Sequence, residues 1–77
     1  MKGDLVYSRR GRDKGFLMAV IREDKDFVYV VDGKKRRLEN PKRKNPRHLT
    51  FLSDSINEEK MKTNRSVRRA LFEAAQN

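Results

Sequence analysis

The residues most able to bind a charged ligand are four basic side chains in the stretch "SRRGRDKGF", residues 8–16. They are Arg9, Arg10, Arg12 and Lys14. Like charges placed this closely repel one another, and this repulsion makes folding less favourable unless counterions or a polyanion offset it. Arginine and lysine also bind phosphate oxygens directly. We therefore expect this stretch to contact the phosphate backbone of a nucleic acid.

A second and larger excess of positive charge lies in residues 34–48. This segment has eight Lys and Arg residues against Glu39 alone, which leaves +7, whereas the whole chain, with 20 Lys and Arg against 11 Asp and Glu, carries +9. Taken alone, "KKRR" or "PKRK" is as typical of a merely solubilising or localisation-type tract as of a nucleic-acid contact. Together with the first stretch, the two runs favour nucleic acid. The predicted contacts from this segment are Lys34, Lys35, Arg36, Arg37, Lys42, Arg43, Lys44, Arg47 and His48.

The residues between the first basic side chains are predicted to set the geometry of a loop. Gly11 and Gly15 provide turns with Asp13 between them, and glycine also lets backbone N–H groups approach phosphate. The spacing in "GRDKG" differs from that of a Walker A motif, so a nucleotide-binding loop is not expected. The aromatic residues are predicted to serve mainly the fold, with Tyr7 best placed to stack on a base.

The composition offers little for catalysis. The chain has one histidine and no cysteine, so it lacks a thiolate nucleophile, a disulfide and the usual zinc ligands. His48 has no neighbour in the sequence that would orient it in a catalytic triad. We therefore predict no enzymatic activity, no catalytic residue, no metal and no cofactor.

An anionic membrane surface is the other polyanion to consider. The sequence has no run of about 18 apolar residues, and "MKGDLVYS" turns polar before the apolar region of a signal peptide forms. These observations predict a soluble, cytoplasmic protein without a membrane partner.

The basic residues must be positioned by one small domain, because 77 residues are too few for two cores. Strands are predicted at residues 5–7, 16–21, 27–31, 34–39 and 48–52. The fourth has one apolar residue, Leu38, and is predicted as an edge or half-exposed strand that cannot be core, with its remaining side chains facing solvent or ligand. The pair Asp32-Gly33 predicts a hairpin turn before it, and Pro41 and Pro46 predict a loop after it. An antiparallel barrel of these strands would bring the two basic segments onto one face.

The last third of the chain predicts a helix. Thr63 or Asn64 can serve as its N-cap. The residues predicted on its apolar face are Val67, Ala70, Leu71 and Ala74, with Arg65, Arg68, Arg69 and Glu73 facing outward. A helix this short is stable only when its apolar face docks. Residues 1–53 are thus assigned to the barrel and residues 54–77 to a linker and the helix.

The sequence also resembles a known family. The stretch "GDLVYSRRGRDKGFLMAVI" resembles the KOW motif, with a Gly-Asp start, a valine-containing strand, a turn glycine, Asp-Lys-Gly and a second apolar strand. The continuation "VYVVDGKKRRLENPKRKNPRHLTFL" is similar to small bacterial KOW-domain RNA-binding proteins, which resemble KOW-type large-subunit ribosomal proteins of archaea and eukaryotes. The likeness covers about two thirds of the chain, and "TNRSVRRAL" also looks like the end of those small proteins.

The resemblance implies a mainly β fold, an SH3-like antiparallel barrel of KOW type, which binds ribosomal or other structured RNA. The positions that match the KOW loop are Gly11, Asp13, Lys14 and Gly15. Ser8 stands where the family often has an apolar residue, which predicts that the first strand ends early. Arg9 and Arg10 are additions that point to this protein's own partner.

We therefore expect a non-catalytic RNA-binding protein that binds ribosomal RNA as a ribosomal, ribosome-associated or assembly protein. Ribosomal proteins are expected as further partners through the C-terminal helix. The alternative is a protein-interaction module that docks on the transcription or translation machinery and uses its basic face to steer association.

Overall fold

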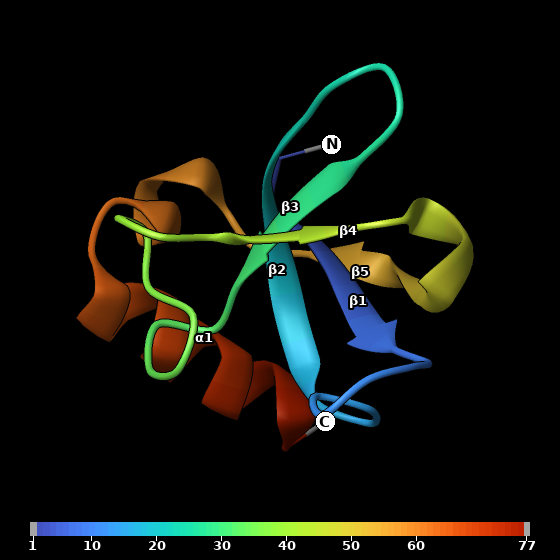
Figure 1. Cartoon of the computed structure of the whole chain (residues 1–77). Coiled ribbons are helices and arrows are strands. Elements are labelled where there is room, and N and C mark those ends of the chain that lie inside the picture. Colours follow the sequence, from blue (N-terminus) through green and yellow to red (C-terminus); the bar gives the residue numbers. More distant parts are fainter. Residues whose placement is uncertain (1, 77) are drawn as a thin grey trace.

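The protein is a five-stranded antiparallel sheet with one C-terminal helix, and the computed structural model describes residues 2–76. The elements in chain order are β1 (Asp4–Ser8), β2 (Leu17–Glu23), β3 (Val28–Val31), β4 (Lys42–Lys44), the 3-10 helix η1 (Pro46–His48), β5 (Leu49–Ser55), the 3-10 helix η2 (Glu58–Met61) and α1 (Asn64–Ala75) (Figure 1). The strand order is β4-β3-β2-β1-β5. Four of the five predicted strands are thereby confirmed, with ends that differ by a few residues.

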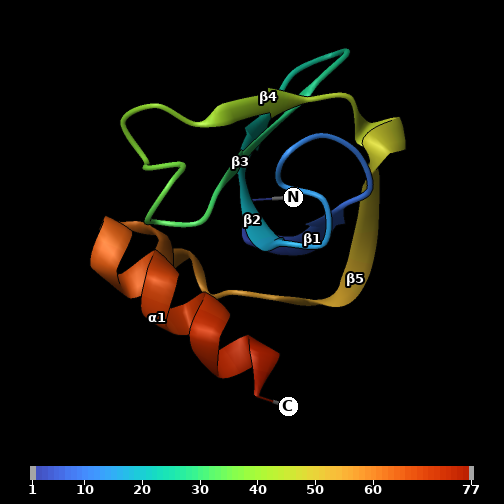
Figure 2. The same ribbon diagram turned by 60° about the horizontal axis from the view of Figure 1, so that its bottom comes forward.

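The sheet is strongly bent but open. Figure 2 shows β4 and β5 on adjacent sides of the curved sheet, with η1 connecting them. Within the part of the chain that the structure describes, β4 pairs only with β3 and β5 only with β1. The antiparallel sheet is as predicted, whereas barrel closure is not observed, because the three-residue β4 leads into a 3-10 turn at Pro46 instead of a ladder with β5.

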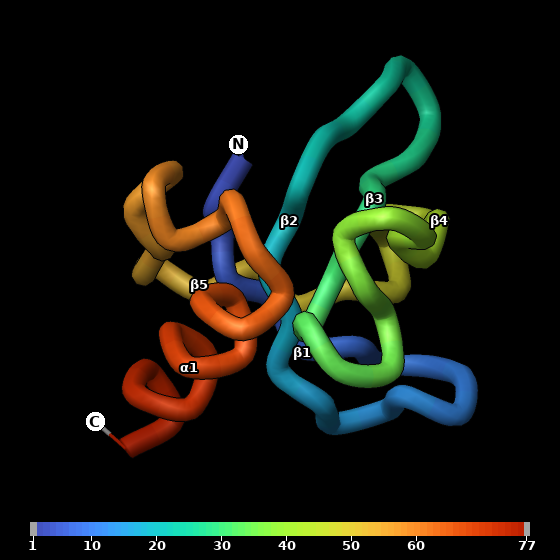
Figure 3. Tube along the Cα trace, turned by 90° about the vertical axis from the view of Figure 1, so that its left-hand side faces the viewer, coloured from blue at the N-terminus to red at the C-terminus, as the bar shows by residue number. Residues whose placement is uncertain are grey.

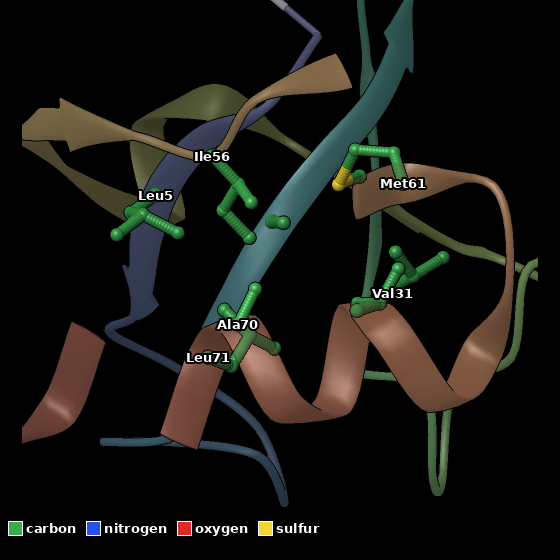
Figure 4. Packing of buried hydrophobic residues seen from close by; sticks show 8 residues of the cluster. Leu5, Val31, Ile56, Met61, Ala70 and Leu71 are labelled. Atoms are coloured by element: carbon green, nitrogen blue, oxygen red, sulfur yellow. The ribbon is translucent and has the colours of Figure 1, made fainter. Parts of the chain in front are cut away.

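Each face of the sheet carries a cluster of buried residues. Successive residues of a strand point to opposite faces, so the strands contribute side chains to both clusters. On one face, residues of the strands pack against η2 and α1, and Figure 4 shows this cluster at close range. Its buried members are Leu5, Ala19, Val31, Ile56, Met61, Val67, Ala70 and Leu71. The second cluster consists of Val6, Met18, Val20, Val28, Val30 and Leu49. The tube in Figure 3 shows α1 on one side of the strands and β4 on the other.

The helix forms as its sequence predicts. The side chain of the N-cap Thr63 accepts a hydrogen bond from the backbone N–H of Ser66 at 3.1 Å. The predicted apolar face contacts the sheet, with Val67, Ala70 and Leu71 buried and Ala74 partly buried. The predicted outward residues Arg65, Arg68, Arg69 and Glu73 are exposed.

The predicted fourth strand at residues 34–39 is wrong. Oδ1 of Asp32 accepts hydrogen bonds from the backbone N–H groups of Lys34 and Arg36 at 2.8 and 2.9 Å, which folds these residues into a turn. The strand forms later, at Lys42–Lys44, inside the segment predicted as a loop. Leu38, the one apolar residue of that segment, packs against the cluster that contains Val67 and Leu71 of α1, and its N–H donates to Oδ1 of Asn64 at 2.7 Å.

Gly33 allows this turn to lie against the helix. Its φ is +79°, and a Cβ built there would lie 2.3 Å from the backbone oxygen of Asn64 and 2.9 Å from the backbone nitrogen of Arg68. Any side chain at this position would therefore push the turn away from α1.

No helix within residues 2–76 has the length and apolar character needed to cross a membrane.

Candidate nucleic-acid interface

Residues 9–15, in the connection between β1 and β2, form a compact loop that we call the basic loop. Gly11 and Gly15 have φ values of +86° and +85°, as their predicted turn role requires. The backbone N–H of Gly15 donates to the oxygen of Ser8 at 2.8 Å, and that of Lys14 donates to Gly11 at 3.2 Å. The four basic side chains, of Arg9, Arg10, Arg12 and Lys14, are all exposed. The backbone thus holds the loop together while its charges face solvent.

Lys44 of β4 holds the basic loop from inside. Its Nζ donates to Oγ of Ser8 at 2.9 Å, to Oδ1 of Asp13 at 2.9 Å and to the backbone oxygen of Arg10 at 3.0 Å. Lys44 is only 7% exposed, and these three acceptors match the three protons of its ammonium group. The prediction that Lys44 contacts RNA is therefore replaced by an internal role, because the ammonium group is already surrounded by protein oxygens.

Ser8 supplies one of the three acceptors around the Lys44 ammonium group. Strand β1 continues through Ser8, so the prediction of an early end to the first strand is wrong. The Ser8 side chain is buried, accepts from Lys44 and lies 2.7 Å from the backbone oxygen of Arg10 and 3.0 Å from Oδ1 of Asp13. An apolar residue at this position would leave one proton of Lys44 without an acceptor.

Asp13 carries the compensating charge. Its burial alone would raise the pKa of its carboxyl, but hydrogen bonds from Lys44 and Ser8 and the charges of Lys44 and Lys42 outweigh that effect and hold the pKa below its usual value of 3.8. Oδ2 of Asp13 lies 3.9 Å from Nζ of Lys42. This oxygen is buried and accepts no hydrogen bond from the residues that the structure describes.

A cavity of about 300 Å³ brings the two basic segments together on the surface. The basic loop and the start of β2 supply one wall, and the turn after β3 and the start of β4 supply the other. The lining residues are Arg12, Asp13, Phe16, Met18, Asp32, Lys35, Arg36 and Lys42. Nζ of Lys35 lies 5.0 Å from the centre of the Phe16 ring, within the range of a cation–π contact across the cavity walls.

A second junction joins the basic loop to the end of the 34–48 segment. The backbone N–H of Arg9 donates to the oxygen of His48 at 2.7 Å, and Nη1 of Arg9 lies 3.4 Å from the oxygen of Arg47. Arg47 is exposed and His48 is half-buried. The basic loop therefore lines the cavity through Arg12 and Asp13 and contacts the end of the 34–48 segment through Arg9.

Three of the predicted contacts in the 34–48 segment, described next, do not line the cavity. Arg43 alternates with Lys42 and Lys44 along β4, so it points to the opposite side of the sheet and stacks on Phe27 at 4.5 Å. Arg37 pairs with Glu39 at 3.2 Å. Lys34 is exposed in the turn beside Phe16 and borders a neighbouring hollow.

The predicted set omitted two features that the fold reveals. Phe16 is 45% exposed at the mouth of the cavity, and its only sequence signal is its place directly after Gly15. On α1, Phe72 is 67% exposed and lines a shallow hollow with Arg65, Arg68 and Arg69. The spacing of these four residues at three and four positions places them on one helix face, a signal that the sequence already contained.

Among residues 2–76, no three His, Cys, Asp or Glu side chains gather closely enough to hold a metal ion. Comparison of the chain with protein-family models and with curated proteins finds no match in either case.

Proposed function

We propose that this protein is a non-catalytic RNA-binding module of the KOW type, which binds structured RNA, ribosomal RNA foremost, as a ribosomal or ribosome-associated protein of the cytoplasm. One observation carries the proposal: the basic loop and residues 34–48, which are far apart in the sequence, share the walls of one cavity. The proposed contacts are Arg9, Arg10, Arg12, Lys14, Lys35, Arg36, Lys42 and Arg47.

The geometry of the sheet supports an SH3-like barrel of the KOW type as the finer description of the fold. Strand β1 pairs with both β2 and β5, and a single 3-10 turn separates β4 from β5. In such a bent sheet the connection between β1 and β2 comes close to β4, which is the relation that Lys44 and Asp13 display. The Gly-Asp pair lies at the start of β1 and the Asp-Lys-Gly sequence lies in the basic loop, which supports the proposed KOW type.

RNA fits this surface better than duplex DNA does. The converging basic side chains come from a loop, a turn and a three-residue strand rather than from one helix that could enter a major groove. Such a surface matches phosphates in the irregular arrangement that loops, bulges and junctions of folded RNA present. The positive charge then supplies affinity, and the shape of the surface supplies the preference for RNA.

Filter binding of the purified protein to ribosomal RNA, with duplex DNA of equal length as competitor, tests the proposal. We expect RNA binding that falls linearly with the logarithm of salt concentration and that excess DNA displaces only weakly. Absence of RNA binding at low salt, or displacement by DNA as effective as by RNA, would contradict it.

The exposed Phe72 favours a second candidate function, docking of the helix on a protein of the transcription or translation machinery. An aromatic side chain surrounded by three arginines is suited to an acidic protein surface with an apolar pocket. Pull-down before and after nuclease treatment separates the two candidates, because a complex that α1 holds through protein contacts survives nuclease and is lost in Phe72→Ala.

A further inference from the structure

We propose that the cavity between the basic loop and the turn after β3 is a pocket for one unpaired nucleotide of the bound RNA. The inference rests on the proposed function and deepens it, since it says which part of the RNA the surface recognises. The base lies against Phe16, and the basic rim holds the phosphates on either side of it.

The size and the apolar lining of the cavity fit a single base. Its volume of about 300 Å³ lies at the lower end of the range of small-ligand pockets. Phe16 and Met18 supply apolar surface. A half-exposed phenylalanine ring at the mouth of a basic pocket is the kind of surface on which unstacked RNA bases stack.

The rim supplies the cations that a nucleotide needs. Arg12, Lys35, Arg36 and Lys42 line the cavity and come from both walls. The Lys35 ammonium lies over the Phe16 ring, and both residues are exposed, so the group that a base would replace there is a solvent-exposed side chain. When a base stacks on the ring in place of Lys35, the Lys35 ammonium moves beside the phosphate of the same nucleotide and pairs with it.

Two carboxylates among these cations belong to the cavity walls and are bound by the protein itself. Oδ1 of Asp13 accepts a hydrogen bond from Lys44, and Oδ1 of Asp32 accepts from the backbone N–H groups of Lys34 and Arg36. Oδ2 of Asp13 is buried. These contacts hold the walls in place, so recognition of the nucleotide falls to stacking on Phe16 and to the cations of the rim.

The test uses two RNA hairpins that differ only in one bulged guanosine in the stem, with binding followed by fluorescence anisotropy. We expect the wild-type protein to bind the bulged hairpin about tenfold more tightly than the fully paired one, because one base–aromatic stack has about this effect. Phe16→Ala should remove this preference while leaving affinity for the paired hairpin unchanged.

Phe51→Ala is the matched control, because Phe51 is exposed to a similar extent, 42% against 45%, and does not line the cavity. It should retain the preference for the bulged hairpin. Phe16→Leu keeps an apolar side chain without a stacking ring and should also lose the preference. Thermal melting of each variant identifies loss of fold, and a folded Phe16→Leu protein that keeps the full preference overturns the proposal.

The remaining outcomes separate this inference from the proposed function. Equal, salt-dependent binding of both hairpins by the wild-type protein overturns the pocket but leaves RNA binding intact. Binding of neither hairpin, nor of ribosomal RNA, overturns both.

Discussion

Lys44 and Asp13 are 31 positions apart in the sequence, and Nζ of the first lies 2.9 Å from Oδ1 of the second. This ion pair fixes the basic loop to β4, the strand of the second basic segment. Because Nζ also donates to Ser8 and to the backbone oxygen of Arg10, contacts within the protein itself hold the loop in place. A loop that is already ordered loses less conformational entropy on binding, so in the proposed RNA complex the internal lysine supports affinity without touching the RNA.

Replacing Lys44 by methionine should lower the free energy of unfolding by about 2–3 kcal/mol, because the carboxylate of Asp13 is left with little compensation. Chemical denaturation with urea measures the change. Lys42→Met is the control and should change stability by less than about 1 kcal/mol, because its ammonium lies 3.9 Å from Asp13 and is more exposed. The double variant Asp13→Asn, Lys44→Met should be more stable than Lys44→Met alone. Equal losses in the two lysine variants would contradict the internal role of Lys44.

Acid should destabilise the protein in part through Asp13. The pKa of this carboxyl is lower in the folded than in the unfolded chain, so the unfolded state binds the proton more readily and the stabilisation is lost as pH falls below about 4. Asp24 and Glu39, whose pKa values are lowered chiefly by hydrogen bonds from Tyr29 and Asn64, respond in the same direction. Urea unfolding of wild type and Asp13→Asn between pH 7 and pH 2 isolates the contribution of Asp13. The variant should lose less stability across this range, and identical acid profiles would show that Asp13 does not contribute.

Arg12→Ala and Lys14→Ala should each weaken binding to ribosomal RNA and lower the slope of log K against log salt by about 0.7–0.9, the effect of one phosphate contact. Lys25→Ala is the matched control, because Lys25 is exposed in the β2–β3 connection, at the opposite end of the sheet from the basic loop (Figure 1). Affinities measured at four or five salt concentrations give the slopes. A slope that changes as much in Lys25→Ala as in the loop variants would indicate non-specific attraction.

Gly33→Ala should destabilise the protein by about 3 kcal/mol, because a Cβ there meets the backbone of Asn64 at 2.3 Å in addition to the strain of a positive φ. Gly15→Ala has a similar φ, and no atom of the described residues lies within 4 Å of its Cβ, so it should lose only about 1 kcal/mol. Thermal melting compares the two variants. If Gly15→Ala proves as harmful as Gly33→Ala, close contact with α1 is not what requires Gly33.

The parts of the fold that the sequence predicts are those specified by local patterns. The helix follows from the spacing of Val67, Ala70 and Leu71 with a Thr63 cap, and β3 follows from its β-branched residues. The fourth strand was placed wrongly because "KKRRLE" and "KRK" are both basic, and the choice between them depends on two non-local facts. Asp32 folds the first into a turn, and Val28 pairs with Lys44 of the second.

In the candidate site, too, the features set by local sequence patterns were predicted and those set by contacts distant in the sequence were not. Clustering of charge predicted that the two basic segments matter, and the fold brings several of their residues to one cavity. Composition could not reveal that Lys44 points inward, because its three acceptors come from residues more than 30 positions away. Phe16 was missed for a related reason: the apolar run that it begins predicts a buried strand residue, and only the loop beside it leaves the ring half-exposed.

Lysine footprinting by chemical acetylation and mass spectrometry, with and without ribosomal RNA, tests the central claim most directly. The chain offers Lys14 on the basic loop and Lys35 in the second segment, with Lys25 and Lys62, both exposed, as internal references. If the two segments form one RNA-binding face, Lys14 and Lys35 become protected together over the same RNA concentrations while Lys25 and Lys62 stay reactive. Protection of only one of the first pair, or of the reference lysines in their place, would contradict the account.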